Sequence, residues 1–129
     1  MKRLLVFILI SQSVLLGQNQ TQQDSATIII KNVSKYMFTK YLVAIKGQTT
    51  GGLNLKPGQI SKFKIANSDD KTYRFTVYLD KQYKDKYDIP PMDYFAQVNE
   101  MEISVGTYTY LIDIDKKDVA LLVKLVKTK

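Results

Sequence analysis

Apolar side chains in this sequence recur with a period near two, in short blocks separated by Gly, Pro, Asn and Asp. This alternation is typical of strands that have one buried face and one solvated face. The clearest example is segment 72–79, where one face holds Tyr73, Phe75, Val77 and Leu79 and the other holds Thr72, Arg74, Thr76 and Tyr78. No long stretch has the spacing of an amphipathic helix.

Seven segments fit the pattern of strands, and turn-forming residues lie between them. We predict turns at 47–52, at Pro57-Gly58, where the sequence suits a type II turn, at 67–70 and at 115–118. The last of these turns should make a hairpin of residues 107–126. The predicted strand segments are 27–31, 38–46, 59–66, 72–79, 94–105, 108–114 and 119–125, and 94–105 fits either one long strand or two short ones.

Short strands joined by turns, without helical crossovers, predict an all-β protein. We expect a single antiparallel β-sandwich of about seven strands, with an immunoglobulin-like or transthyretin-like architecture. A small closed β-barrel has the same alternation of side chains and stays open as the alternative.

The first residues have the layout of an export signal. Lys2 and Arg3 precede an apolar run that is interrupted by polar residues 11–13 and ends at Gly17. A membrane-spanning helix needs about 20 continuous apolar residues, more than this run contains. We predict that 1–17 is a cleaved signal peptide, that the protein is secreted or periplasmic, and that it has no stable membrane span.

The segment 18–25 contains no apolar side chain, so we predict a flexible leader there and a folded domain over 26–129. Removing 1–17 takes away two of the 19 basic residues and leaves a net charge of +5. The domain is therefore only moderately basic, and export argues against a nucleic-acid partner.

The composition excludes many kinds of chemistry. The 129 residues include no Cys, His or Trp, which removes disulfides, thiol nucleophiles, imidazole bases and most zinc sites. Calcium would need clustered carboxylates, but the acids of segment 80–93 lack the usual loop spacing and alternate with lysines. We predict no cofactor, no metal and no catalytic residue. The acids considered are Asp80, Asp85, Asp88 and Asp93.

Segment 80–93 is long for a connection between strands and is rich in Tyr, Asp and Lys. Tyrosine offers a large ring and a polar tip, which suits recognition surfaces. We predict a recognition site for a protein, peptide or glycan of the cell envelope, formed by Tyr83, Tyr87, Asp88 and Tyr94. The alternative is a connector whose tyrosine rings cover the end of the fold.

A second candidate surface is basic. If strands 59–66 and 72–79 pair, Lys62, Lys64 and Arg74 become neighbours on an outer face beside Tyr78. Such a face suits an anionic membrane or polysaccharide, although lysines also keep sheet edges soluble.

The sequence thus favours an exported, non-catalytic binding or accessory module. One alternative is a glycan hydrolase that uses paired carboxylates, either Glu100 with Glu102 or Asp113 with Asp115. Another is a structural subunit that assembles through an exposed strand edge of the 107–126 hairpin. The triplet Asn32-Val33-Ser34 also matches an N-glycosylation acceptor.

Overall fold

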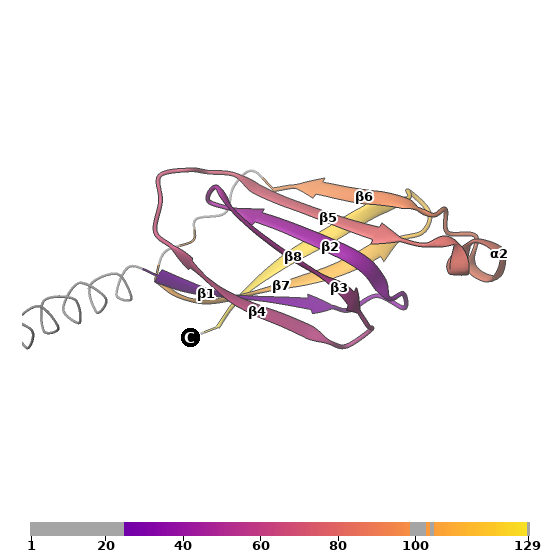
Figure 1. Cartoon of the computed structure of the whole chain (residues 1–129), viewed down its shortest axis with the longest axis horizontal. Coiled ribbons are helices and arrows are strands. Elements are labelled where there is room, and N and C mark those ends of the chain that lie inside the picture. The colour runs from indigo at the N-terminus through magenta and orange to yellow at the C-terminus, as the bar shows by residue number, and fades with distance from the viewer. Residues whose placement is uncertain (1–24, 99–102, 104, 129) are drawn as a thin grey trace, which may run out of the picture.

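The computed structural model describes residues 25–98, 103 and 105–128 (Figure 1). The predicted signal peptide, most of the predicted leader, and both Glu100 and Glu102 lie outside the described residues. The all-β prediction is confirmed, and the described residues form eight strands in two sheets of four. The strands are β1 (Ser25–Asn32), β2 (Phe38–Ile45), β3 (Gln48–Leu55), β4 (Ile60–Ala66), β5 (Tyr73–Leu79), β6 (Met92–Gln97), β7 (Gly106–Asp115) and β8 (Ala120–Thr128).

The first sheet has the strand order β4-β1-β7-β8 and the second has the order β3-β2-β5-β6. The expectation of purely antiparallel pairing is wrong at one position, because β1 runs parallel to β7. After β1 the chain crosses to the second sheet, so β1 pairs with strands that come much later in the sequence. The predicted hairpin of the last two strands is confirmed, since β7 and β8 pair along their whole shared length.

The prediction of a turn at 47–52 is wrong, because β3 begins at Gln48. The turn consists of Lys46 and Gly47 alone, which have φ values of 53° and 79° and match the two-residue turns preferred in hairpins. Gly51 and Gly52 lie inside the strand. A Cβ atom on Gly52 would lie 2.6 Å from the Tyr41 hydroxyl oxygen. These glycines therefore allow close packing against β2 and do not mark a turn.

Strands 59–66 and 72–79, whose pairing the predicted basic face requires, do not pair with each other. β4 pairs with β1 in the first sheet, whereas β5 pairs with β2 and β6 in the second sheet. The segment between them bends through local hydrogen bonds, including one from the Thr72 backbone N–H to Asp70 Oδ1 at 2.7 Å. Hydrogen bonds from the side chain and backbone of Thr72 hold the pKa of Asp70 below its usual value. Such bonds define a bend but do not select the sheet that follows it.

The predicted turn at Pro57-Gly58 is confirmed. The Gln59 backbone N–H donates to the Lys56 carbonyl at 3.0 Å, and Gly58 has a φ of 84°, as a type II turn requires at its third position. Segment 94–105 does not form one continuous strand, because β6 ends at Gln97 and Val98 is outside any strand; residues 99–102 and 104 lie outside the described residues, so the alternative of two short strands is not tested.

The inner faces of the two sheets supply one hydrophobic core. The inward set predicted for β5 is confirmed, since all four of its side chains are buried. Phe75 from the second sheet packs on Tyr110 from the first, with ring centroids 4.8 Å apart. The Tyr110 hydroxyl is buried without a hydrogen-bond partner among the described residues, and burial raises its pKa.

Asn32 fastens the end of β1 to two neighbouring segments. Its side chain is completely buried, and Nδ2 donates to the carbonyls of Tyr36 (2.7 Å) and Leu55 (2.9 Å). Its Oδ1 accepts from the backbone N–H and the hydroxyl of Ser34. Both amide hydrogens are therefore used inside the fold. The triplet that resembles a glycosylation acceptor has a structural role here, and its amide is not accessible for modification in the folded chain.

Candidate binding surfaces

The segment between β5 and β6 is a folded cap at one end of the sheets. It contains the 3₁₀ turn η1 (Lys81–Tyr83) and the one-turn helix α2 (Lys84–Tyr87), which protrude at that end (Figure 1). The Asp80 side chain accepts a hydrogen bond from the Gln82 backbone N–H and begins η1. Ile89 is completely buried and anchors the far side of the cap.

Tyr83 and Tyr87 of this cap pack against Tyr36, and we refer to these three residues as the tyrosine cluster. The Tyr36 ring meets Tyr83 and Tyr87 edge to face, with centroids 5.0 and 5.6 Å away. The Met37 backbone N–H donates to the Tyr83 hydroxyl at 2.7 Å. Burial, followed by the nearby Tyr87 and Asp113 side chains, raises the pKa of Tyr36. The rings thus contribute contacts that hold the cap on the fold.

The other two residues of the predicted recognition site also have structural contacts. Tyr94 is 1% exposed, and its hydroxyl donates to the Pro90 carbonyl at 2.8 Å. Burial and then the neighbouring Tyr36 raise the pKa of Tyr94. Asp88 ends α2 in the left-handed conformation, with a φ of 56°, and its backbone N–H bonds to the Lys84 carbonyl.

These contacts are the ones expected if the tyrosine rings cover the end of the fold, which is the alternative to a recognition site. Tyr83 and Tyr87 are only half-buried, so parts of both rings still reach the surface. Recognition through them stays a prediction. Tyr94 has no ring surface available to a partner.

The basic face expected from Lys62, Lys64 and Arg74 does not form. Lys62 and Lys64 lie on the outer side of β4 in the first sheet. Arg74 lies on the outer side of β5 in the second sheet, where its guanidinium carbon is 5.5 Å from the centroid of the Phe95 ring. The physical reason is the crossing between sheets after β4, which places the two groups in different sheets.

The outer side of the second sheet carries the most accessible aromatic and apolar groups of that sheet, and we call it the aromatic face. The register places Lys40, Tyr78 and Asp93 side by side across β2, β5 and β6. The next row holds Leu42, Thr76 and Phe95. The exposed fractions of the apolar members are 43% for Leu42, 53% for Phe95 and, on β3, 70% for Leu53.

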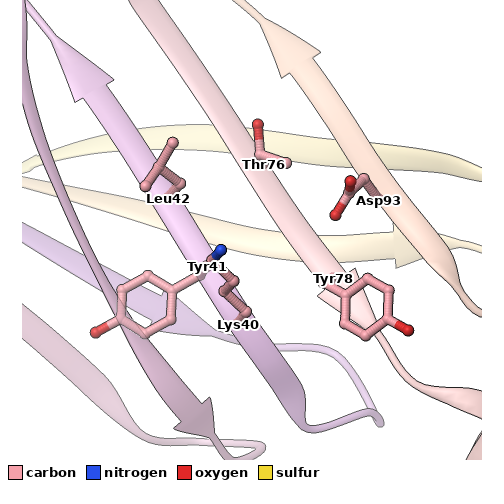
Figure 2. Close-up of a pocket in the computed structure, with 6 residues that line it drawn as sticks. All are labelled: Lys40, Tyr41, Leu42, Thr76, Tyr78 and Asp93. Carbon is pink, nitrogen blue, oxygen red and sulfur yellow. The ribbon is translucent and has the colours of Figure 1, made fainter.

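A shallow depression of about 210 Å³ lies on this face (Figure 2). Figure 2 shows Tyr78 and Asp93 on adjacent strands, with the short Thr76 side chain beside them. Thr76 is small, and the larger Tyr78 and Leu42 rise around it. The depression is lined by Lys40, Tyr41, Leu42, Thr76, Tyr78 and Asp93.

The depression combines an aromatic ring, an ammonium group and a carboxylate within one row of the sheet. Neighbouring strands are about 5 Å apart, so Lys40 and Asp93 flank the Tyr78 position from about 10 Å apart. A ligand lying over Tyr78 would meet a hydrogen-bond donor on one side and an acceptor on the other. This arrangement suits binding of a flat, polar, uncharged group.

The paired acids of the first sheet serve local structure. Asp113 Oδ1 accepts from the Ile114 backbone N–H at 2.8 Å, and Asp115 Oδ1 accepts from the Lys117 backbone N–H at 3.0 Å. Asp115 therefore shapes the turn between β7 and β8. No observation on either residue favours the hydrolase alternative, which stays a prediction.

Among the described residues, no three His, Cys, Asp or Glu side chains gather in a way that would hold a metal ion. In the same part of the chain, no helix has the length and apolar character needed to cross a membrane.

No protein-family model matches the sequence, and no curated protein matches it. The fold is similar to that of a solved structure described as the NMR structure of the protein from Eubacterium rectale. The TM-score is 0.50 and the sequence identity is 13%, and the match covers 81% of this chain and 91% of the other. At this identity the likeness concerns the fold alone.

Sequence reasoning did not select the aromatic face, although it placed Tyr78 on the outer side of strand 72–79. What the sequence lacked was the information that strands 38–46 and 72–79 are neighbours. The pairing of β2 with β5, which spans about 30 residues of chain, brings Lys40 opposite Tyr78.

Proposed function

We propose that this protein is an exported, non-catalytic binding module that recognises a glycan through the aromatic face. The observation that carries the proposal is the row Lys40, Tyr78 and Asp93 beside a depression on an exposed sheet. Accessible apolar groups gathered on one side of a small domain mark interaction surfaces. Export follows from the predicted signal peptide and stays part of the proposal.

A sugar matches the chemistry of this row better than a charged small molecule does. One face of a pyranose ring presents C–H groups that can lie on an aromatic ring, while its edge presents hydroxyls. Those hydroxyls accept from an ammonium group and donate to a carboxylate. Lys40 and Asp93 carry opposite charges, so the row has no net charge to favour an anion or a cation.

We propose further that the two sheets form a β-sandwich of the transthyretin-like rather than the immunoglobulin-like kind. Constant-type immunoglobulin domains place their first, second, fourth and fifth strands in one sheet. Here the first strand pairs with the fourth and seventh, and the second pairs with the third and fifth. No strand pairing joins the two sheets among the described residues, which supports a sandwich over a closed barrel.

The proposal is tested with the chain that begins at Gln18, which retains every described strand. NMR spectra are recorded during titration with maltohexaose, cellohexaose and chitohexaose. We expect at least one of these sugars to shift the amide signals of Thr76, Tyr78 and Asp93. Replacing Tyr78 by Ala should then weaken binding by about tenfold, because the loss of an aromatic contact costs roughly 1 kcal/mol or more.

Tyr87→Ala is the matched control, because it removes a half-buried tyrosine from the cap. If Tyr87→Ala abolishes binding and Tyr78→Ala does not, the tyrosine-rich segment is the recognition site and the aromatic face is not. If none of the three sugars binds, the glycan proposal fails.

A second candidate is a structural subunit that assembles through a strand edge. β8 is the outermost strand of the first sheet, as that hypothesis requires of the 107–126 hairpin. An unpaired edge can accept another strand. Light scattering over a range of protein concentrations decides this point, because a mass that stays at that of one chain contradicts assembly.

A further inference from the structure

The outer side of the first sheet gathers four lysines from three strands. Register places Lys31 of β1 diagonally next to Lys62 of β4, and Lys64 follows two residues further along β4. Lys124 of β8 lies in the same row as Lys31, with Leu111 between them. All four are exposed, and none forms an ion pair with a residue that the structure describes. We call this surface the lysine face.

The acids of this sheet do not balance these charges. Asp113 and Asp115 lie at the end of β7 next to the turn, where they pair with Leu122 and Ala120 of β8. Their Oδ1 atoms already accept hydrogen bonds from backbone N–H groups. The strands β1, β4 and β8 contain no acidic residue. Like charges placed on adjacent strands disfavour the free protein slightly, and an anionic partner would remove that cost.

Apolar side chains accompany the lysines on β8. Leu122, Lys124 and Val126 alternate along the outer side of this edge strand, and the two apolar groups are 48% and 42% exposed. These aliphatic side chains offer a polysaccharide neither a hydrogen bond nor an aromatic ring. A lipid surface offers anionic headgroups to the lysines and an apolar boundary to leucine and valine.

We propose that the lysine face docks onto the surface of an anionic lipid bilayer. The lysines supply attraction at the headgroup level, while Leu122 and Val126 reach the acyl boundary. This contact is separate from the aromatic face, which belongs to the other sheet and would point away from the membrane. The protein would thus lie on the bilayer and present its binding surface outward.

Binding is measured by sedimentation of the Gln18-initiated chain with vesicles of phosphatidylglycerol and phosphatidylcholine in equal amounts. Each lysine near an anionic surface contributes about a fivefold gain in partitioning. Replacing Lys31, Lys62, Lys64 and Lys124 together by Gln should therefore reduce partitioning by about a hundredfold or more. Vesicles of phosphatidylcholine alone should retain little protein.

The matched control has the same change in net charge at exposed lysines outside the strands. It replaces Lys71, Lys81, Lys84 and Lys86 by Gln. This variant should keep most of its partitioning, and circular dichroism checks that both variants remain folded. An equal loss in both variants would show that only net charge matters and would overturn the docking proposal.

A second measurement reports which face of the protein contacts the vesicles, and it does not depend on a variant that binds more weakly. The chain has no cysteine, so Leu122→Cys and Leu42→Cys each give one labelling site for an environment-sensitive dye. With phosphatidylglycerol vesicles, the dye at position 122 should shift to the blue and the dye at position 42 should not. Equal shifts, or no binding to these vesicles together with binding to polygalacturonate, contradict a lipid partner.

Discussion

The tyrosine cluster and the aromatic face place the same kind of side chain in opposite surroundings. In the cluster, the Tyr36, Tyr83 and Tyr87 rings contact one another, and a hydroxyl accepts a backbone hydrogen bond. On the aromatic face, the Tyr78 ring lies beside an open depression and shares a row with Lys40 and Asp93. Aromatic content alone therefore does not identify a binding surface.

The difference between the two regions comes from what each ring has next to it. A ring whose edge and hydroxyl are both engaged adds to the stability of the fold, and its removal leaves buried groups unpaired. A ring that borders open space contributes little to folding and stays available to a ligand. Folding stability and ligand binding should consequently respond to mutations at different tyrosines.

The largest contrast in the free energy of unfolding is expected between variants at two adjacent residues. Tyr94→Ala should lower the free energy of unfolding by about 4 kcal/mol, because it empties a fully buried site. Phe95→Ala, one residue later on the opposite face, is the matched control and should cost less than about 1 kcal/mol. Urea unfolding monitored by circular dichroism measures both. Similar losses would show that the two faces of β6 are not buried differently.

A smaller loss in the free energy of unfolding is expected when the buried side-chain amide of Asn32 is changed. Asn32→Asp replaces the amide nitrogen that donates to two carbonyls by an oxygen that would face them. The free energy of unfolding should fall by about 3 kcal/mol as a result. Asn67→Asp provides the control, since only Asn67 Oδ1 is engaged and an aspartate keeps that acceptor. A stable Asn32→Asp variant would mean that the amide does not anchor this end.

The smallest contrast concerns single hydroxyl groups. Tyr83→Phe removes the acceptor of the Met37 N–H and should lower the free energy of unfolding by about 1 kcal/mol. Tyr78→Phe removes a hydroxyl that has no hydrogen bond to a described residue, so its effect should be near zero. Chemical denaturation of both variants measures the difference. Equal values would contradict the assignment of Tyr83 to the fold and Tyr78 to the surface.

Much of the fold was predictable because local side-chain alternation is a strong signal. The inward set of β5 and the final hairpin follow directly from period-two patterns and a polar turn. The failures have one physical origin. Gly51 and Gly52 allow a strand to pack closely against Tyr41 instead of forming a turn, and the bend at 67–70 leads to the other sheet; both outcomes depend on contacts that local sequence does not report.

The prediction of a binding surface depends on knowing which strands are neighbours, even more than the prediction of the strands themselves does. Lys62 and Lys64 were correctly placed on a solvated face, but their real companions are Lys31 and Lys124 rather than Arg74. Those companions lie on strands distant in the sequence, and no pattern within a single strand reveals them. Tyr83, Tyr87 and Tyr94 were found by composition, but composition does not report how far each ring is buried.

The parallel pairing of β1 with β7 has a consequence for how the chain reaches its final shape. Residues 25–32 have no partner on one side until residues 106–115 have been made, because about 80 residues separate the two strands. Closing so long a stretch of chain is slow compared with forming a hairpin. The first sheet therefore cannot be completed while the ribosome has made only the first half of this chain. For the same reason, loss of the last 25 residues would remove β7 and leave β1 exposed along one edge.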